Sequence, residues 1–189
     1  MRRKSFDVLF ATKTGMGWLA QHPTLWRSLF YFVISMGAFT GVCTNIAFAD
    51  QYLWVRLGVL LGVLSAHLLI IIVFGCFLHG LIDACGGGSG NVWGLLCIMG
   101  FTTLPFLVLT PLALMAMRLG GVAVLVLPIA CILGYIWCVY LLMRAVEAVY
   151  LLNFRQAFVV VVFALLLWAL MLGLPIYLVV HFLTLAFFS

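Results

Sequence analysis

Charged side chains are scarce in this chain: nine Lys or Arg and four Asp or Glu occur among 189 residues. Soluble globular domains contain about a quarter charged residues, whereas here the charged fraction is 7% and the hydrophobic fraction is 68%. This excludes a soluble domain, because its apolar surface would have no polar shell in water. It also excludes disorder, which requires low hydrophobicity. The mean hydropathy of +1.36 indicates an integral membrane protein whose solvent is the lipid bilayer.

The alternation of polar and apolar residues that is typical of a transmembrane strand barrel is absent as well. Instead, five apolar stretches each supply the about 20 residues with which a helix crosses hydrocarbon. We expect an all-α integral membrane protein with a cytoplasmic segment over 1–27 and a five-helix domain over 28–189. The last stretch is longer than a straight crossing, so it must tilt, kink at Pro175 or run past the bilayer. The predicted spans are about 28–49, 57–82, 92–117, 122–143 and 157–188.

The basic residues are distributed unevenly around these spans, and this asymmetry predicts the orientation. A cytoplasmic N-terminus leaves only Arg56 and Arg118 outside. It places Arg2, Arg3, Lys4, Lys13, Arg27, Arg144 and Arg155 inside. We therefore expect the N-terminus in the cytoplasm and, after five crossings, the C-terminus outside. The cations lie at the edges of spans and form no patch for phosphates, so nucleic acid is not expected as a partner.

A short interfacial helix is predicted ahead of the first span, within residues 5–19. Phe6, Leu9 and Phe10 recur there at helical spacing, which favours a helix lying on the inner membrane surface. We expect Gly15, Gly17 and Pro23 to end it. A partly ordered basic tail is the alternative interpretation.

Small residues at four-residue spacing predict how the first two spans pack. Gly37 and Gly41 form such a step in the first span, and Gly58, Gly62 and Ala66 form another in the second. In lipid, helices associate through close backbone approach at small residues. We therefore expect the first two spans to touch along these faces.

Two prolines interrupt the third span. Pro105 and Pro111 each remove a backbone donor, and membrane helices tolerate this only where other groups satisfy the freed carbonyls. Thr102, Thr103 and Thr110 lie within a turn and are the expected donors. The prolines indicate either a structural kink or a kink that also lines a cavity.

Few ionisable side chains lie within the spans, and such groups are candidates for function. Cys76, His79 and Asp83 lie on one helix face, a spacing compatible with a metal or proton-relay site. No CxxC or HExxH motif completes such a site, so a hydrogen-bonded histidine at the membrane boundary is the favoured interpretation. His67 points roughly away from Cys76 and is expected to bond a carbonyl or hydroxyl of another helix.

The end of the fourth span carries a pair of opposite charges. Arg144 and Glu147 are one helical turn apart, and Arg155 follows. They predict either an ion pair at the membrane boundary or a docking point for a cytoplasmic partner or lipid headgroup. The glycine-rich stretch Gly86–Asn91 lacks the residues of a phosphate loop or a nucleophile elbow, and is expected to be a tight inner turn. No catalytic constellation can be assembled, so neither enzymatic activity nor a cofactor is expected.

Three stretches resemble the core of the Yip-domain membrane proteins, the Ypt/Rab-GTPase-interacting proteins and their bacterial relatives. The first runs from His79 to Gly88 and continues as Ser89-Gly-Asn-Val-Trp93. The second is Gly100-Phe-Thr-Thr-Leu-Pro105, and the third is the run from Glu147 to Phe158. In that family a His-containing helix leads into a Gly-Gly turn, and a helix with a Gly-aromatic-small-small-apolar-Pro motif follows. The resemblance extends over roughly residues 20–180.

The resemblance implies a non-enzymatic, multi-pass membrane protein. Eukaryotic members act in membrane traffic and bind small GTPases. This sequence has neither a long polar stretch before its first span nor the basic residue often found in the glycine-rich turn. It is therefore similar to the bacterial-type members, and we expect a prokaryotic plasma membrane protein.

Two functions follow as hypotheses. The first is a scaffold or adaptor that binds a cytoplasmic or membrane protein, or a second copy of itself, at its inner loops. It predicts that Asp83, Arg144, Glu147 and Arg155 gather at one face. The alternative is a small-solute or lipid transporter that uses the proline-broken third helix and His67. Across both hypotheses the candidate binding residues are His67, His79, Asp83, Thr102, Thr103, Pro105, Arg144, Glu147 and Arg155.

Overall fold

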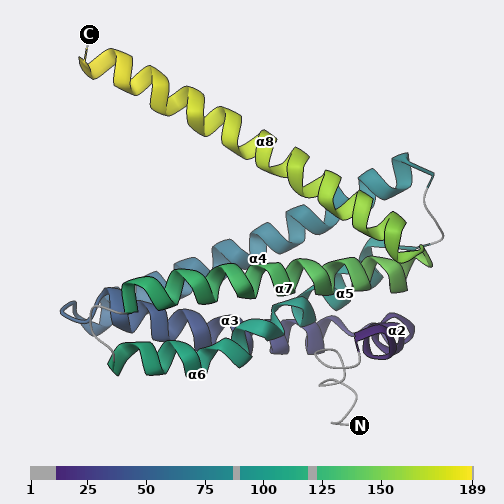
Figure 1. The fold of residues 1–189 in the computed structure, drawn as a ribbon, viewed down its shortest axis with the longest axis horizontal. Helices are drawn as coiled ribbons and strands as arrows, with labels where there is room; N and C mark the ends of the chain where they lie inside the picture. The colour runs from purple at the N-terminus through teal and green to yellow at the C-terminus, as the bar shows by residue number, and fades with distance from the viewer. Residues whose placement is uncertain (1–11, 87–89, 119–122, 189) are drawn as a thin grey trace.

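The computed structural model describes residues 12–86, 90–118 and 123–188, and every element within these ranges is a helix (Figure 1). Five helical stretches are long and apolar enough to cross a membrane, with α5, η1 and α6 counted as one. This confirms the predicted all-α class and the number of spans. The elements are α2 (Thr12–Gln21), α3 (Leu25–Ala47), α4 (Leu53–Ala84), α5 (Val92–Met99), the 3-10 helix η1 (Gly100–Thr103), α6 (Leu104–Arg118), α7 (Ala123–Tyr150) and α8 (Phe154–Phe188).

The helices extend beyond the predicted spans into charged residues. α4 includes both Arg56 and Asp83, and α7 continues through Arg144 and Glu147 to Tyr150. The hydropathy pattern marks the edge of the hydrocarbon, but the backbone hydrogen-bond ladder does not stop there. These charged side chains therefore lie on helical turns that continue past the apolar stretch.

The short helix before the first span is present, although its limits differ from the prediction. α2 begins at Thr12 and runs through Gly15 and Gly17, which do not end it. Met16 and Leu19 are buried in a cluster with Ile98 and Leu141, so α2 packs onto the spans. This packing compensates for the low helix propensity of glycine. The predicted contributions of Phe6, Leu9 and Phe10 lie outside the described residues.

The third crossing is broken where α5 passes into η1. In a regular helix the N–H of Gly100 would donate to the carbonyl of Leu96. Here the Ser28 hydroxyl of α3 lies between them: it accepts from the Gly100 N–H at 2.9 Å and donates to the Leu96 oxygen at 3.3 Å. A side chain inserted into the ladder is a known cause of helix kinks. A Cβ at position 100 would overlap the backbone of Ser28, so α3 reaches this site only because residue 100 is glycine.

The prolines free the carbonyls of Phe101 and Leu107, four residues before each ring. The threonines around the break donate to other carbonyls, so the expectation that they satisfy the freed ones is wrong. Thr102, Thr103 and Thr110 each donate to the carbonyl three or four residues earlier, at 2.7–2.8 Å. The Thr103 hydroxyl also lies 2.7 Å from Ser35 Oγ on α3. The break is therefore closed by hydroxyl groups of its own turn and of α3.

The predicted contact between the glycine faces of the first two spans is wrong. No atom would lie within 4 Å of a Cβ at Gly41, Gly58 or Gly62, and Gly37 would reach only the tip of Leu64. α3 instead packs most extensively against α6. Two contacts hold α3 on the third crossing: the Ser28 hydroxyl inserted between Gly100 and Leu96, and the buried Phe39–Phe106 ring pair. The small residues of α4 are left exposed.

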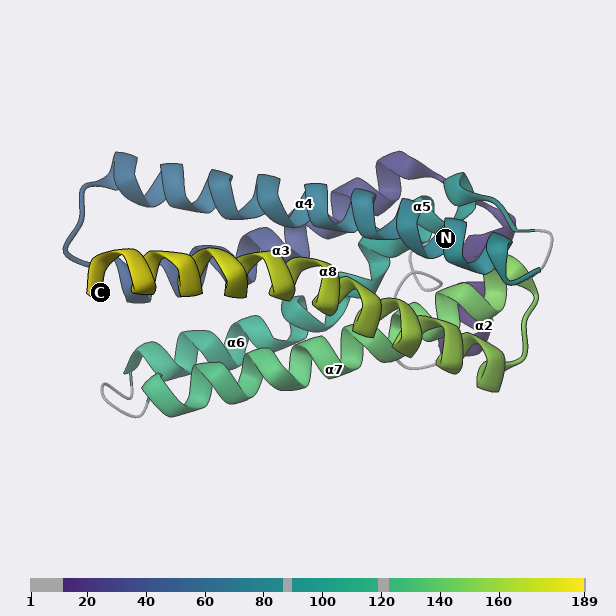
Figure 2. The same cartoon turned by 90° about the horizontal axis from the view of Figure 1, so that it is seen from above.

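The last helix is inclined away from the bundle. Its first half packs against α4 and α7 through Ala157, Val161 and Ala164, and the Trp168 ring lies against Phe74. Beyond this region α8 departs at an angle and continues as a helix through Pro175, so the long final stretch tilts (Figure 1). Viewed from above, α4 runs along one side of the bundle while α6 and α7 run along the other (Figure 2).

Candidate functional site

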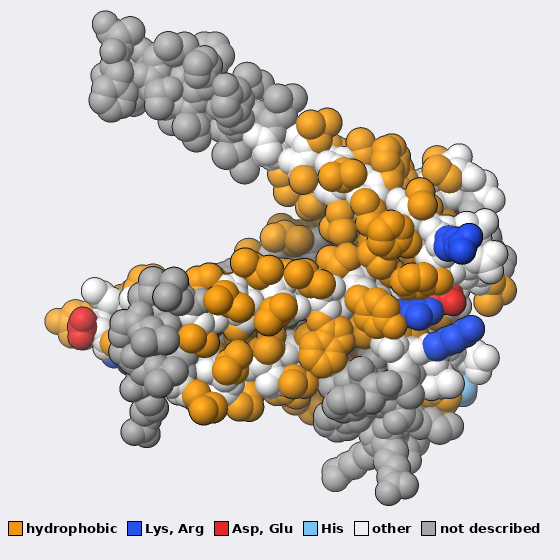
Figure 3. All heavy atoms as spheres, in the orientation of Figure 1, with side chains coloured by type: hydrophobic (Ala, Val, Ile, Leu, Met, Phe, Trp, Pro, Cys, Tyr) orange, Lys and Arg blue, Asp and Glu red, His pale blue; other side chains and the backbone are white. Residues whose placement is uncertain are grey.

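Most basic side chains of the described chain lie at one end of the bundle, which we call the basic end. Lys13 is on α2, Arg27 is in the first turn of α3, Arg144 is near the end of α7 and Arg155 is in the first turn of α8. Arg56 lies at the opposite end, where it donates to backbone carbonyls of Ala49 and Gln51. Figure 3 shows Lys and Arg side chains gathered at the basic end, beside an apolar surface that extends along the helices.

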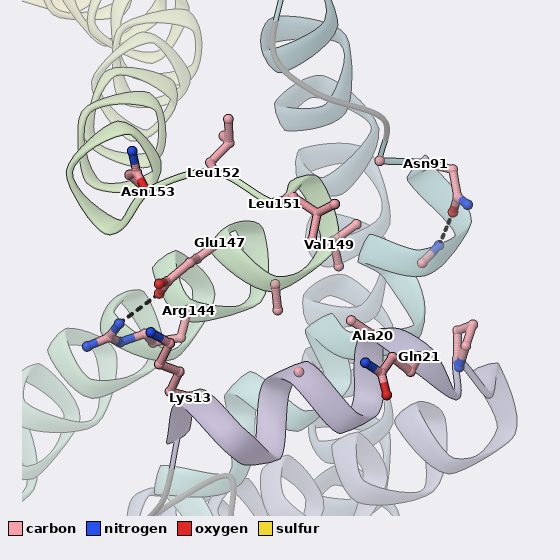
Figure 4. A pocket seen from close by; sticks show the side chains of 15 residues that line it. Lys13, Ala20, Gln21, Asn91, Arg144, Glu147, Val149, Leu151, Leu152 and Asn153 are labelled. Carbon is pink, nitrogen blue, oxygen red and sulfur yellow. Dashed lines mark hydrogen bonds and ion pairs between the residues drawn. The ribbon is translucent and has the colours of Figure 1, made fainter.

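A groove of about 600 Å³ opens at the basic end between α2, the start of α5 and the end of α7. One wall is α2, which is fixed by the burial of Met16 and Leu19. The opposite wall is the last turns of α7 and the link to α8. Figure 4 labels residues that line the groove from α2, from the start of α5, and from the end of α7 with the link to α8.

An ion pair lies on the α7 wall of this groove. Arg144 Nη1 donates to Glu147 Oε2 at 2.7 Å, which is the i, i+3 contact expected from the spacing. Arg144 Nε also donates to the Tyr140 hydroxyl at 3.2 Å. The guanidinium carbon lies 4.3 Å from the centre of the Phe154 ring of α8, a cation–π geometry. Arg144 therefore links α7 to α8 as well as lining the groove.

Lys13, Gln21 and Asn153 add further polar groups to the groove. The exposed Lys13 ammonium makes no ion pair among the described residues. The side-chain amides of Gln21 on α2 and Asn153 before α8 are exposed on the two walls. Between them, Val149 and Leu152 supply apolar surface. The groove thus combines an exposed lysine ammonium, amide donors and acceptors, and an apolar floor.

A buried tyrosine holds the loops that frame the groove. The Tyr150 hydroxyl lies 2.7 Å from Nδ1 of His79, joining the end of α7 to α4. Gly90, which lines the groove, packs against the face of the Tyr150 ring, and a Cβ there would overlap the ring. Leu151 then takes a positive φ of 55°, which turns the chain toward α8.

The predicted site residues separate into two groups. Asp83 and Arg155 lie at the basic end with Arg144 and Glu147, but they are exposed and do not line the groove. His67, Thr102 and Thr103 instead line a cavity within the spans, and Pro105 lies in the first turn of α6 beside it. Part of the glycine-rich turn, 87–89, lies outside the described residues.

The alternative of a metal site at Cys76, His79 and Asp83 gains no support. Within the described part of the chain no three His, Cys, Asp or Glu side chains are grouped so that they could hold a metal. His79 is bonded to Tyr150, and Cys76 is exposed on the outer face of α4. A shared helix face is not enough to form a metal site, because these three side chains do not converge on one point.

Our sequence reasoning missed several residues that line the groove. Gln21, Asn91 and Asn153 are polar residues at helix ends, and only Asn91 carries a recognisable signal. It precedes an apolar run, as an N-cap residue does. Its side chain accepts the Gly94 N–H at 2.5 Å and so fixes the start of α5. The roles of the other two depend on how α2 and α8 are placed.

The fold and the site together define a multi-pass helical membrane protein with a polar groove at its basic end. Residues 6–182 match the model of the Yip1 domain, and since this covers nearly the whole chain, the protein belongs to the Yip1 domain family. No curated protein and no solved structure matches the chain.

Proposed function

We propose that this protein is a non-enzymatic membrane adaptor that binds an acidic segment of a cytoplasmic or membrane protein in the groove at its basic end. The observation that carries the proposal is the composition of the groove. Lys13 offers an exposed cation with no ion pair among the described residues, and the amides of Gln21 and Asn153 offer donors and acceptors of the kind that a peptide backbone needs. Apolar surface between them suits a small side chain of the partner.

The orientation rests on charge. The basic end carries Lys13, Arg27, Arg144 and Arg155, and the opposite end of the described chain carries Arg56 and Arg118, the last residue of α6. Cytoplasmic loops carry the excess of Lys and Arg, so the groove opens to the cytoplasm in this proposal. Membership of the Yip1 domain family supports a role in organising membranes through protein contacts. A prokaryotic plasma membrane is the proposed location.

The groove and the cavity within the spans share no lining residue, which favours an adaptor over a transporter. On α5, the fully buried Leu95 separates Gly94 of the groove from Met99 of the cavity. On α7, Val146 is fully buried between Leu142 and Glu147 in the same way. These side chains belong to one packed cluster, so a solute would have to displace core residues to pass.

Photocrosslinking tests the adaptor proposal. A photoreactive amino acid at Gln21 faces the groove, and the same residue at Gln51 serves as the control, because Gln51 is exposed at the opposite end. We expect a discrete crosslinked protein from position 21 only, attached through an acidic segment. Lys13→Glu should abolish the product, Lys13→Arg should retain it, and reversing the partner's charges should restore crosslinking to Lys13→Glu. Equal products from both positions, or no effect of Lys13→Glu, would refute the proposal.

Transport remains the second candidate, because His67, Thr102 and Thr103 do surround a cavity at the depth of the break. Vesicles containing the purified protein discriminate the two functions. A transporter would move a labelled lipid or an ion across the vesicle membrane, and His67→Ala would alter that rate. An adaptor would leave the lipid and ion distribution equal to that of protein-free vesicles.

A further inference from the structure

Two cavities lie end to end within the membrane-spanning part of the molecule. The outer one, about 290 Å³, runs from the end of α3 at Ala47 and Phe48 toward the middle of the bundle. The middle one, about 200 Å³, continues to Trp168 on α8. They have four lining residues in common: Met36, His67, Phe106 and Tyr135.

The junction of the cavities lies near the bilayer midplane. His67 is fourteen residues into α4, which begins at Leu53. Counted from Leu57, where the predicted second span begins, His67 is ten residues in, or about 15 Å at 1.5 Å per residue, which is half of a hydrocarbon core of about 30 Å. The space exists because α4 lies across the bundle from α7 and contacts it only sparsely, and because the third crossing is broken beside it.

The polar groups at the junction satisfy one another. His67 Nδ1 lies 2.9 Å from the Val63 carbonyl, which can only accept, so Nδ1 carries the proton. Nε2 is then an acceptor and receives the Tyr135 hydroxyl at 3.3 Å. Thr102 and Thr103 donate to carbonyls of their own turn. Among the described residues no buried side-chain oxygen or nitrogen lacks a hydrogen-bond partner.

We propose that one hydrocarbon chain of a membrane lipid occupies both cavities, entering at the Phe48 end and passing the His67–Tyr135 pair to reach Trp168. The polar groups at the junction and in the middle cavity are already paired and offer a water molecule few of the hydrogen bonds it needs. The outer cavity adds the Thr40 and Thr44 hydroxyls to an otherwise largely apolar lining. Most of the lining is aliphatic or aromatic, so a hydrocarbon chain restores the contacts that an empty space forfeits. The lipid headgroup lies at the end opposite the basic end.

The test uses full-length protein in bilayer discs of phosphatidylethanolamine and phosphatidylglycerol. The probe is a phosphatidylcholine with a diazirine at the end of one chain. We expect crosslinks in α7 between Cys131 and Leu142 that excess unlabelled phosphatidylcholine suppresses. Crosslinks to exposed Leu166 report lipids around the protein and should persist under this competition. Native mass spectrometry should retain one lipid per chain.

Matched substitutions identify the site. Cys43→Phe fills the outer cavity, which Cys43 lines, whereas Cys76→Phe places the same ring on an exposed face away from both cavities. Cys43→Phe should lower the competable labelling of α7 at least about tenfold, or about 1.4 kcal/mol, and should remove the retained lipid. Cys76→Phe should change neither. Cys131→Phe fills the same cavity from α7 and replaces Cys43→Phe if that variant fails to fold.

The result that overturns the proposal is equally specific. Competable labelling of α7 that survives in a folded cavity-filled variant would show that the chain does not follow this path. Absence of any competable labelling in the unmodified protein would show that the cavities hold no lipid chain. The adaptor proposal depends on the groove at the basic end and is unaffected by either outcome.

Discussion

Removal of the Ser28 hydroxyl is expected to destabilise the third crossing. Ser28 is 3% exposed and is the group that pairs both the Gly100 N–H and the Leu96 carbonyl. Each buried polar group left without a partner costs about 1–3 kcal/mol, but hydrogen bonds between membrane helices have measured values averaging only about 0.6 kcal/mol, with a maximum of about 1.7. We expect Ser28→Ala to cost about 1–2 kcal/mol, because the two backbone groups can partly re-pair with each other.

Thermal unfolding in lipid bicelles, followed by tryptophan fluorescence, measures this change. For a chain of this size 1 kcal/mol corresponds to about 2–4 °C, so Tm should fall by roughly 2–8 °C. Ser65→Ala is the matched control, since Ser65 also lies in a span but is exposed and makes no described hydrogen bond. It should stay within about 0.5 kcal/mol of the unmodified protein.

Gly100→Ala provides an independent check of the same contact. The added Cβ would overlap the backbone carbonyl of Ser28. Because Ser28→Ala leaves that carbonyl in place, the double variant should not regain the stability that Gly100→Ala loses. Overpacking of this kind costs about 1–3 kcal/mol. Equal stabilities of Ser28→Ala and Ser65→Ala would refute the reasoning that Ser28 holds the break.

Two further predictions concern the groove. Gly90→Ala should cost about 2 kcal/mol, because its Cβ would overlap the Tyr150 ring. Gly80→Ala, where no atom lies within 4 Å, should cost nothing, and equal melting temperatures would contradict the packing. Arg144→Ala should cost about 1–2 kcal/mol through loss of its ion pair and ring contact. Arg155→Ala should change stability by less than about 0.5 kcal/mol, and similar losses for both arginines would show that the contacts of Arg144 contribute nothing.

The sequence alone predicted the features that depend on the lipid bilayer and on the helical repeat. Apolar length predicts the five spans. The Arg144–Glu147 pair follows from helical spacing alone. Each of these is a local property, since a bilayer imposes the same requirements on every helix.

Long-range contacts decided the rest. The glycine spacing suggested that α3 and α4 pack along their glycine faces, yet Ser28 finds its partners on the third crossing and α3 packs most extensively there. Nothing in the sequence near Gly100 indicates a residue 72 positions earlier. The positions of Lys13 and Gln21 in the groove likewise depend on where α2 docks.

Hydropathy and helical period therefore determined how many membrane-spanning stretches this protein has and which charges pair along one helix. Those signals arise from the backbone and the bilayer. Which helices meet, where cavities remain and which polar groups face a common groove were decided only by tertiary structure. The physical reason is that in lipid every helix face is apolar, so partners are selected by shape and by hydrogen bonds between distant residues.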